Sequence, residues 1–365
     1  MICTRTLPPH GSRFICTAIA VGLMVVTACA AQDQARQPGE GAENNAMANE
    51  ITPELDAAVV KGLEGLAALQ EQDGAFGGGR LGRNVAVSSL ACLAFMADGN
   101  LPGRGQYAEN VTRGLNYILA NCTESGLIAD DAANGPMYGH GFAALFLGEV
   151  YGMTAGGPDT ALAARVHEAL VKSIRLIERT QNDQGGWRYN PVPYDADVSV
   201  TICQIMALRS ARNAGIEVDK NVIDKAVRYV RQCQNPDGGF RYQVELGASG
   251  WPRSAAGVAS LFYAGIHEDD AIDRGIKYLM NEALPGRGMG SRAHYHYGHY
   301  YAVQAMYLAG GDAWATWWPA IRAELISQQT DRGTWRDNSI GDAYATAMNL
   351  IVLQMPKRYL PIFQK

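Results

Sequence analysis

The stretch Gln181-Asn182-Asp183-Gln184-Gly185-Gly186-Trp187 follows a segment that opens with Lys172-Ser173-Ile174. A glutamine, a glycine-containing turn and an aromatic residue recur in the same order at three other places in the chain. These copies are Gln70 to Phe76, Gln234 to Phe240 and Gln329 to Trp335. Self-similarity at a spacing of about 50 residues is the sequence signature of a repeat architecture.

Basic–small–apolar openings like Lys172-Ser173-Ile174 mark six repeats. They are Lys61-Gly62-Leu63, Arg113-Gly114-Leu115, Lys172-Ser173-Ile174, Lys225-Ala226-Val227, Arg274-Gly275-Ile276 and a degenerate copy around Ile321. Apolar residues recur at helical spacing after each opening, and a second helix rich in small residues follows each turn. The second helices are predicted over residues 85–96, 141–150, 198–209, 255–263, 301–308 and 343–353. No run alternates as a strand would, so no sheet is expected.

Each repeat is therefore predicted to be helix, glycine turn, helix. We expect the glutamine to close the C-terminal end of the first helix, where backbone carbonyls lack donors. The aromatic ring should pack on the neighbouring repeat. One helix pair cannot bury its own apolar face, so the pairs must stack. Six pairs are enough to close an all-α ring, an (α/α)₆ toroid with the small-residue helices inside.

Shared motifs indicate that three repeats were copied once. Repeats 1 and 4 share Asp-Gly-x-Phe, repeats 3 and 6 share Trp-Arg, and repeats 2 and 5 share Tyr-Gly-His. The copies are Asp73–Phe76 and Asp237–Phe240, Trp187-Arg188 and Trp335-Arg336, and Tyr138–His140 and Tyr297–His299. The ring should therefore have approximate twofold symmetry, as two sets of three repeats.

The N-terminal residues are typical of an export signal. Residues 1–30 combine basic residues with an apolar stretch, Ile15 to Ala28, that is short for a membrane-spanning helix. The stretch ends in Val26-Thr27-Ala28-Cys29, which indicates a lipoprotein signal with lipidation at Cys29. Ordinary signal-peptidase cleavage is the alternative. Residues 31–50 are too polar to fold and predict a disordered linker to a domain over 51–365. We expect an exported protein of the periplasm or outer cell envelope, with a membrane contact through the lipid.

The composition narrows the partners and cofactors. The 365 residues are 47% hydrophobic and 18% charged, with a net charge of -5, and phosphate binding needs a basic field that this balance lacks. A nucleic-acid partner is therefore not expected. Four cysteines lie in the domain, Cys92, Cys122, Cys203 and Cys233. They fit either two disulfides, 92–122 and 203–233, or four buried thiols, and without a CxxC spacing they do not predict a cysteine zinc site.

The Gln…Gly-x-Trp/Phe turns after basic–small–apolar helices resemble the QW repeat of squalene–hopene cyclases and the related repeat of protein prenyltransferase β-subunits. The resemblance covers roughly residues 55 to 356. The chain is also similar to exported planctomycete-type members of that superfamily. This resemblance implies an α/α-toroid and a hydrophobic, isoprenoid-type ligand in its lumen.

The family's catalytic motifs are incomplete here. The cyclases' Asp-x-Asp-Asp acid motif is matched by Asp195-Ala196-Asp197-Val198, in which Val198 replaces the last aspartate. Prenyltransferases hold zinc through an Asp, a Cys two residues later and a distant His, but Ser199 stands at the cysteine position. The thioester motif Gly-Cys-Gly-Glu-Gln is absent from the sequence. Asp195 and Asp197 remain the catalytic candidates, and zinc is not supported by the usual ligand pattern.

Polar residues at the starts of the inner helices are candidates for a lumen site, because those starts should meet at one mouth of the ring. The stretch from His294 to Tyr301 holds three histidines and four tyrosines. It fits an aromatic and hydrogen-bonding ligand wall, structural packing, or a metal site. The ligand-binding candidates are His140, Trp187, His294, His296, Tyr297, His299, Tyr300 and Asp342. Asp197 and Asp342 should face across the lumen, or merely cap helices.

Three functions stay open from the sequence. The first is a terpenoid cyclase- or prenyltransferase-like protein that holds a hydrophobic small molecule in an aromatic-lined lumen. The second is a non-catalytic cell-envelope binding or scaffold protein, whose lumen would be filled by its own side chains. The third is a carbohydrate-active (α/α)₆ enzyme, which would need two carboxyl groups in an open groove.

Overall fold

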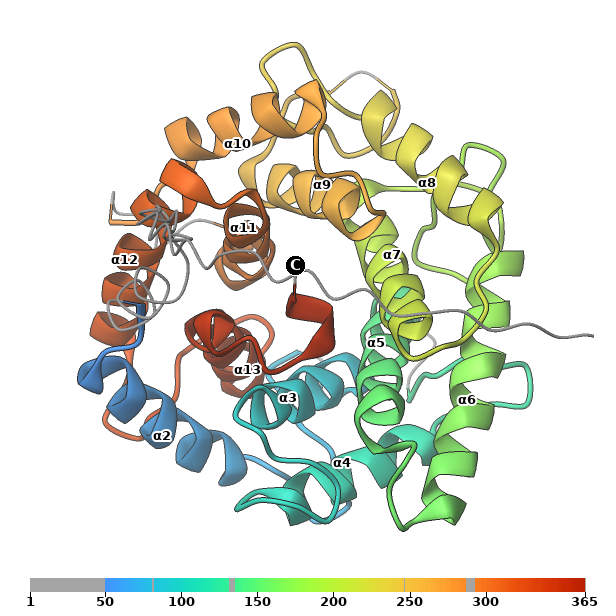
Figure 1. Ribbon diagram of the computed structural model, residues 1–365, viewed down its shortest axis with the longest axis vertical. Helices are drawn as coiled ribbons and strands as arrows, with labels where there is room; N and C mark the ends of the chain where they lie inside the picture. Colours follow the sequence, from blue (N-terminus) through green and yellow to red (C-terminus); the bar gives the residue numbers. More distant parts are fainter. Residues whose placement is uncertain (1–49, 81, 131–134, 246, 287–292, 365) are drawn as a thin grey trace, which may run out of the picture. The chain divides into compact units, whose positions relative to one another are not determined.

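The computed structural model describes residues 50–80, 82–130, 135–245, 247–286 and 293–364. The predicted signal segment over 1–30, Cys29 and all of the linker except Glu50 lie outside the described residues. The described part contains twelve α-helices, arranged as six consecutive pairs. Each pair has one helix on the outside of a ring and one on the inside (Figure 1). The predicted (α/α)₆ toroid is therefore confirmed.

The inner helices form a closed ring. They are α3 (Val85–Ala97), α5 (Met137–Thr154), α7 (Val198–Asn213), α9 (Trp251–Tyr263), α11 (Tyr295–Ala309) and α13 (Asp342–Leu353). Each packs against the next, and α13 packs against α3 to close the circle (Figure 1). Helices α5, α9 and α11 begin earlier than predicted, because their first turns include Tyr, Gly, Pro and His residues that hydrophobic periodicity alone does not mark.

The outer helices surround this ring. They are α2 (Pro53–Ala67), α4 (Ala108–Ala120), α6 (Thr160–Arg179), α8 (Lys220–Gln232), α10 (Asp270–Glu282) and α12 (Gly311–Gln328). Most are amphipathic: α8 buries Val222, Ile223, Ala226, Tyr229 and Val230 on one face. The inner helices are buried nearly all round, as expected of helices enclosed by others.

The glutamine shared by four turns has a role beyond the predicted one. Gln329 is the C-cap of α12, and its backbone N–H donates to Ile326 O at 3.3 Å. Its side-chain amide donates to Gly333 O in its own turn at 2.9 Å and to Ala58 O of α2 at 2.8 Å, joining the last repeat to the first. Gln70, Gln181 and Gln234 make the equivalent pair of bonds. One goes to the glycine carbonyl of the same turn and the other to a carbonyl of the next outer helix. The glutamine therefore joins repeats, since its long side chain reaches past the helix end.

The turn glycines and the aromatic residues complete this junction. At Gly333, φ is +82°, and a Cβ there would lie 2.1 Å from Lys61 O of the next repeat. Only glycine tolerates both the backbone conformation and the contact. The backbone N–H of Trp335 then donates to the hydroxyl of Thr346 on the inner helix at 3.0 Å. Phe76, Trp187 and Phe240 make the same bond to Ser88, Thr201 and Ser254.

Two smaller features bear on the predictions: a short strand pair was not expected, and the cysteines match the alternative of thiols rather than disulfides. The turn of the first repeat holds a short antiparallel pair, β1 (Gly77–Gly78) with β2 (Gly82–Arg83). The cysteines Cys92, Cys122, Cys203 and Cys233 are free thiols in the structure. Across the described ranges, no helix combines the length and apolar character needed to cross a bilayer.

Candidate functional site

A cavity of about 1130 Å³ lies at the N-terminal end of the ring, where the six inner helices begin. Every inner helix contributes to its wall. The wall residues from the inner helices are Val85, Ala86, Val87 and Leu90 of α3, Tyr138, Gly139 and Phe142 of α5, Ser199 of α7, Trp251, Pro252 and Arg253 of α9, Tyr297 of α11, and Tyr344 and Met348 of α13. The inner helices are therefore parallel, and their first turns converge on one hollow, as predicted.

Most of this wall is aromatic or aliphatic. Tyr138 and Phe142 are four residues apart on α5, and Tyr344 and Met348 are four apart on α13, so each pair lies on one helix face. The loops add Tyr189 and Tyr242, and the rings of Tyr138 and Tyr189 are 6.1 Å apart. The arrangement can enclose an apolar molecule while offering several phenol hydroxyls.

Charged groups occupy a minority of the wall. Asp130 accepts a hydrogen bond from Tyr117 Oη at 2.7 Å. Arg253 donates from Nε to Phe240 O at 3.1 Å and from Nη2 to Ala248 O at 2.8 Å. Arg80 and His294 are exposed at the wall. His294 has a φ of +59°, a strained backbone for a non-glycine residue at the start of α11.

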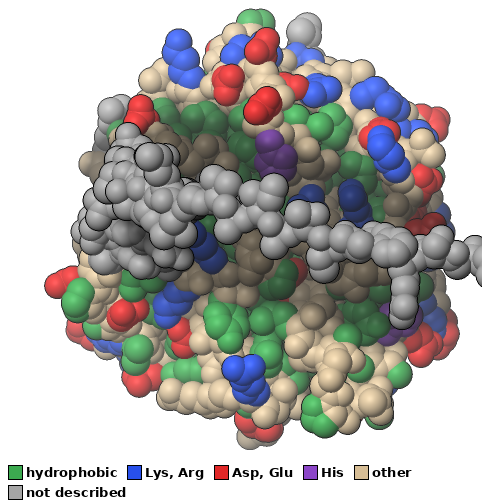
Figure 2. All heavy atoms as spheres, viewed as in Figure 1, with side chains coloured by type: hydrophobic (Ala, Val, Ile, Leu, Met, Phe, Trp, Pro, Cys, Tyr) green, Lys and Arg blue, Asp and Glu red, His purple; other side chains and the backbone are tan. Residues whose placement is uncertain are grey.

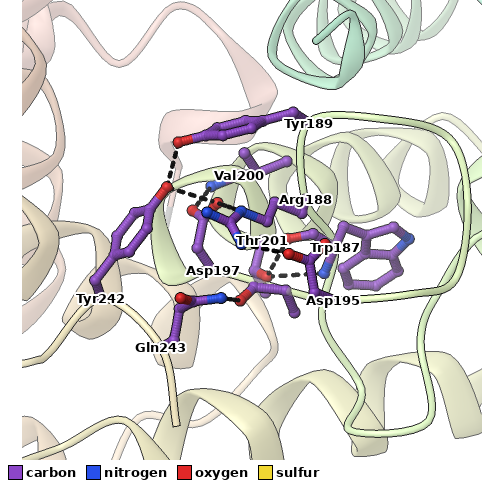
Figure 3. A network of polar contacts seen from close by, with 10 residues as sticks. Trp187, Arg188, Tyr189, Asp195, Asp197, Val200, Thr201, Tyr242 and Gln243 are labelled. Atoms are coloured by element: carbon purple, nitrogen blue, oxygen red, sulfur yellow. Dashed lines mark hydrogen bonds and ion pairs between the residues drawn. The ribbon is translucent and has the colours of Figure 1, made fainter. Parts of the chain in front are cut away.

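Asp197 lies behind this wall as the N-cap of α7 (Figure 3). Its Oδ1 accepts from the N–H of Val200 at 2.9 Å, which satisfies one free donor of the helix start. Its Oδ2 accepts from the hydroxyl of Tyr242 at 3.1 Å, and Tyr242 in turn contacts the hydroxyl of Tyr189. The carboxyl is fully buried, so it is connected to the cavity only through the tyrosine that lines it.

Burial raises the pKa of Asp197 to about 6, while the bonds from Val200 and Tyr242 and the charge of Arg188 oppose the rise. Arg188 Nε is 3.7 Å from Asp197 Oδ2, and its guanidinium pairs with Asp195. The same guanidinium lies over the rings of Tyr189 and Tyr242, at 5.1 and 5.7 Å from their centroids. Arg188 thus fixes both catalytic candidates in one network (Figure 3).

This network can hold or exchange one proton near neutral pH. Asp195 is tied to Arg188 and is absent from the cavity wall. Val198, at the position of the third aspartate in the cyclase motif, is fully buried and apolar. Val198 therefore adds no carboxyl group to the hydrogen-bonded network around Asp197.

The two Tyr-Gly-His motifs place their tyrosine on the cavity and their histidine away from it. His140 is fully buried, accepts from the N–H of Ile128 at Nδ1 (3.2 Å) and has Nε2 3.2 Å from Ser173 O. Burial lowers its pKa to about 4, which keeps the ring neutral. His140 accepts the turn's backbone N–H as Ser88 does in the first repeat, and it is not among the residues that line this cavity.

His296 and His299 are also away from the cavity. The ring of His299 is fully buried against Trp251, Tyr295 and Trp317, with centroids 5.0, 4.5 and 5.8 Å away, and burial lowers its pKa to about 3. His296 Nδ1 lies 3.1 Å from Asn349 Oδ1. Both histidines therefore pack between helices, and of the three only His294 reaches the wall.

Three further predicted residues also lie outside the wall. Trp187 belongs to a repeat junction, where its indole N–H donates to Ile177 O at 2.8 Å. Tyr300 is buried and packs edge-on against Phe142. Asp342 is exposed, accepts from the N–H of Asp337 at 3.3 Å and is absent from the wall. Tyr297 is on the wall, and its hydroxyl donates to Ser199 O at 3.2 Å.

Several wall residues were missed from the sequence, above all Tyr138, Tyr189, Tyr242 and Trp251. Tyr138 could have been found, because it matches Tyr297 in the paired Tyr-Gly-His motifs. Tyr242 comes from a neighbouring repeat, and no motif joins it to Asp197. Among the residues that the structure describes, no three His, Cys, Asp or Glu side chains are grouped as metal ligands would be.

Comparisons with known proteins agree with this geometry. The squalene-hopene cyclase C-terminal domain matches residues 159–295, from the start of α6 to the start of α11. Type II terpene cyclase MstE from Scytonema has 15% sequence identity and a TM-score of 0.56, with 85% of this chain and 98% of that chain covered. The chain is an α/α-toroid that is similar to squalene-hopene cyclases over residues 159–295.

Other solved structures share the toroid fold, and one of them is described as a mannanase. A protein from Actinoplanes is 16% identical, with a TM-score of 0.57 over 84% of this chain and 99% of that chain. An inactive variant of an α-1,6-mannanase of Salegentibacter sp., in complex with α-1,6-mannotetrose, is 9% identical with a TM-score of 0.62 over 82% and 98%. No curated protein matches the sequence. At these identities the likeness establishes the toroid fold alone.

Proposed function

We propose that this toroid binds a hydrophobic, isoprenoid-type ligand in the cavity at the N-terminal end of the ring, without protonating it. The observation that carries the proposal is the wall itself, on which aromatic and aliphatic side chains from five of the six inner helices, with Ser199 from α7, surround one hollow. Pockets for small molecules are mostly apolar, with a few polar groups that fix orientation. Tyr138, Tyr242 and Tyr297 would supply such polar groups through their hydroxyls.

The size of the cavity supports a ligand larger than a metabolite of a few atoms. Its volume of about 1130 Å³ is slightly above the range of roughly 300–1,000 Å³ found for ligand pockets. One solved neighbour, MstE, is described in complex with geranylgeranyl dihydroxybenzoate, its substrate. A ligand with a chain of about that length is the class that we propose.

Binding without protonation is supported by the state of Asp197. Both of its oxygens accept hydrogen bonds, its charged neighbour is Arg188, and it is not exposed to the cavity. A carboxyl whose pKa is about 6 exchanges protons with oxygen or nitrogen groups, whereas a carbon–carbon double bond needs a far stronger acid. We infer that Asp197 orders Tyr242 and the start of α7 rather than starting a cyclisation.

A carbohydrate-active role has weaker support. Glycoside hydrolysis ordinarily needs two carboxyl groups at the scissile bond. Asp130 is the single carboxylate that the described residues place on the wall, and it is already bonded to Tyr117. Because structurally similar mannanases are known, α-1,6-mannotetrose serves as the control ligand in the binding test.

The test is a binding measurement on a matched pair of variants. Ala86 lies on the cavity wall, and Ala164 is exposed on α6, so Ala86→Phe fills the cavity while Ala164→Phe adds the same ring outside it. Geranylgeraniol binding is measured by native mass spectrometry and by quenching of tryptophan fluorescence. We expect Ala86→Phe to weaken binding at least about tenfold, or 1.4 kcal/mol. Ala164→Phe should change binding less than twofold.

Two outcomes would overturn the proposal. Either geranylgeraniol does not bind the unchanged protein, or it binds Ala86→Phe as tightly as Ala164→Phe. Binding of mannotetrose in place of geranylgeraniol, lost in Ala86→Phe, would move the function to carbohydrates. Analysis of the recovered geranylgeraniol for cyclic products tests the second half of the proposal, and cyclisation that depends on Asp197 would contradict it.

A further inference from the structure

The C-terminal end of the ring, where the inner helices end, is closed by residues 355–364, here called the plug segment. It contains two short 3₁₀ helices, η2 (Met355–Lys357) and η3 (Pro361–Phe363). Figure 1 views the ring from this end and shows η3 inside the circle of inner helices. The segment contacts α5, α7, α11 and α13 and buries Met355, Leu360, Ile362 and Phe363.

The face around the plug segment is divided by polarity. Where it is visible in Figure 2, acidic and basic side chains lie mainly toward the outer edge, and hydrophobic side chains gather nearer the middle. The plug segment packs its own apolar side chains against four of the inner helices. The segment contacts inner helices α5, α7, α11 and α13, and it does not add a further helix pair to the toroid.

Few polar contacts join the plug segment to the ring. The N–H of Ile362 donates to Glu149 Oε2 of α5 at 3.1 Å. At the surface, Lys357 pairs with Asp98 at 2.6 Å, and Arg358 is 3.9 Å from Glu50. Other backbone bonds run within the segment, such as Phe363 N–H to Leu360 O at 3.0 Å. Surface ion pairs contribute little to stability. The buried hydrogen bond from Ile362 to Glu149 is therefore the main polar contact that holds the plug segment on the ring.

Glu149 is an unusual anchor because it is a carboxyl that is 1% exposed. Its Oε1 accepts from Ser210 Oγ of α7 at 2.7 Å. Burial raises the pKa of Glu149 to about 7, although the bonds from Ser210 and Ile362 lower it. The charge of an ionised Glu149 would act on two tyrosines, Tyr263 of α9 and Tyr300 of α11. Burial holds the pKa of both hydroxyls well above neutral, so both tyrosines are uncharged.

The charged groups around this cluster do not neutralise Glu149. The charge of Arg209 of α7 lowers the pKa of Tyr263. The pKa of Glu149 is set by burial and by its hydrogen bonds from Ser210 and Ile362, without a contribution from a basic group. The plug residues next to it, Pro361, Ile362 and Phe363, have no titratable side chain. An ionised Glu149 would therefore stay buried without a cation as long as the plug segment remains in place.

We propose that the plug segment is a proton-controlled gate, closed over Glu149 while this carboxyl is protonated and loosened when it ionises. Opening would admit water to Glu149, Ser210 and Tyr300, whose hydroxyl has no hydrogen-bond partner among the described residues. Water stabilises the ionised carboxyl, so the ionised form favours the open gate. The gate lies at the other end of the ring from the ligand cavity and does not depend on what that cavity binds.

The sign of the pH dependence follows from proton linkage. In the closed state the pKa of Glu149 is about 7, and in the open state it returns toward its ordinary value of 4.5. The closed state therefore holds the proton more tightly, and raising the pH through this window favours opening. Below the lower value and above the higher one the equilibrium is flat. The opening equilibrium should change by up to about 300-fold across the window.

Hydrogen exchange of the backbone amides of Ile362 and Phe363 measures this opening in the full chain. Between pH 4.5 and 8, after correction for intrinsic exchange, their protection should fall by up to about 300-fold. Glu149→Gln keeps an acceptor for Ile362 and a partner for Ser210 but cannot ionise. In this variant protection should stay constant with pH. A wild-type protection that does not change, or a fall of equal size in Glu149→Gln, would overturn the proposal.

A second variant keeps the test decisive if Glu149→Gln does not fold. Phe363→Ala removes a buried ring of the plug segment but leaves Glu149 and its partners in place. Protection of the Ile362 amide should then be lower than in the wild type at every pH, with the same dependence on pH. Unchanged protection in Phe363→Ala would show that the segment does not open as a unit, and the gate would be rejected.

Discussion

The junctions between repeats and the wall of the cavity follow opposite rules. At the junctions, one set of contacts is made four times over: a glutamine bridge, a left-handed glycine and an aromatic N–H bonded to a hydroxyl. On the wall, the residue two positions before that hydroxyl-bearing residue differs between these repeats: it is Ala86, Ser199, Pro252 or Tyr344. The repeated residues hold the ring together, and the residues that vary shape what the ring can bind.

This difference predicts a separation of effects. Junction substitutions should lower the free energy of unfolding, and wall substitutions such as Ala86→Phe should change binding with little loss of stability. The last junction is the most informative, because Gln329 and Gly333 join the sixth repeat to the first. Breaking it opens the ring at one place, whereas the wall can be altered with the ring intact.

The largest loss is expected for Gly333→Ala. The new Cβ would meet Lys61 O at 2.1 Å, in a residue whose φ of +82° already disfavours a side chain. Strain and overpacking together should cost about 3 to 5 kcal/mol. Gly265→Ala is the matched control, because its φ is +92° but nothing lies within 4 Å of the added Cβ. It should cost about 1 to 2 kcal/mol in chemical denaturation, and an equal loss in both variants would argue against close packing at the junction.

The next effect is expected for Gln329→Ala. The change leaves Ala58 O and Gly333 O without their side-chain donor, and two partly buried bonds are lost. The cost should be about 2 to 4 kcal/mol of unfolding free energy. The neighbouring Gln328 is exposed, and Gln328→Ala should cost less than about 0.5 kcal/mol. Thermal unfolding compares the stability of the two variants directly. A similar loss of stability in both would show that the side-chain bonds of Gln329 do not stabilise the junction.

A smaller, pH-dependent effect is expected for Asp197→Asn behind the wall. Burial raises the pKa of Asp197 from 3.8 to about 6, so its ionisation makes the wild type less stable as the pH rises through this window. Asparagine also caps helices and does not ionise. The variant should therefore gain about 1 to 2 kcal/mol relative to the wild type between pH 4 and 6, with no further gain above. A relative loss over this range would show that the ion pair with Arg188 outweighs burial.

The fold was largely predictable because its signals repeat. Each Gln…Gly…aromatic turn marks a junction, and four copies in one chain cannot be explained by a single local turn. The role of the glutamine was not predictable, since the carbonyl that Gln329 reaches belongs to Ala58 at the other end of the domain. Only closure of the ring brings these two residues together.

The site was less predictable because sequence proximity does not place residues on the same side of a helix. In Tyr138-Gly139-His140 the tyrosine and the histidine are two residues apart, and positions i and i+2 point to different faces. Tyr138 reaches the cavity, and His140 faces Ser173 of an outer helix. Tyr297 and His299 repeat this division. Most of the histidine and tyrosine cluster therefore packs between helices, and of its side chains only His294 and Tyr297 line the cavity.

Photoaffinity mapping tests the central claim most directly. A geranylgeraniol analogue with a diazirine on its chain is bound, irradiated and located by peptide mass spectrometry. The account predicts labels on the cavity wall, at residues such as Tyr138, Trp251, Tyr297 and Tyr344, and their loss when excess geranylgeraniol competes. Labels confined to the outer helices or to the plug segment, and unaffected by competition, would contradict a ligand site at the N-terminal end of the ring.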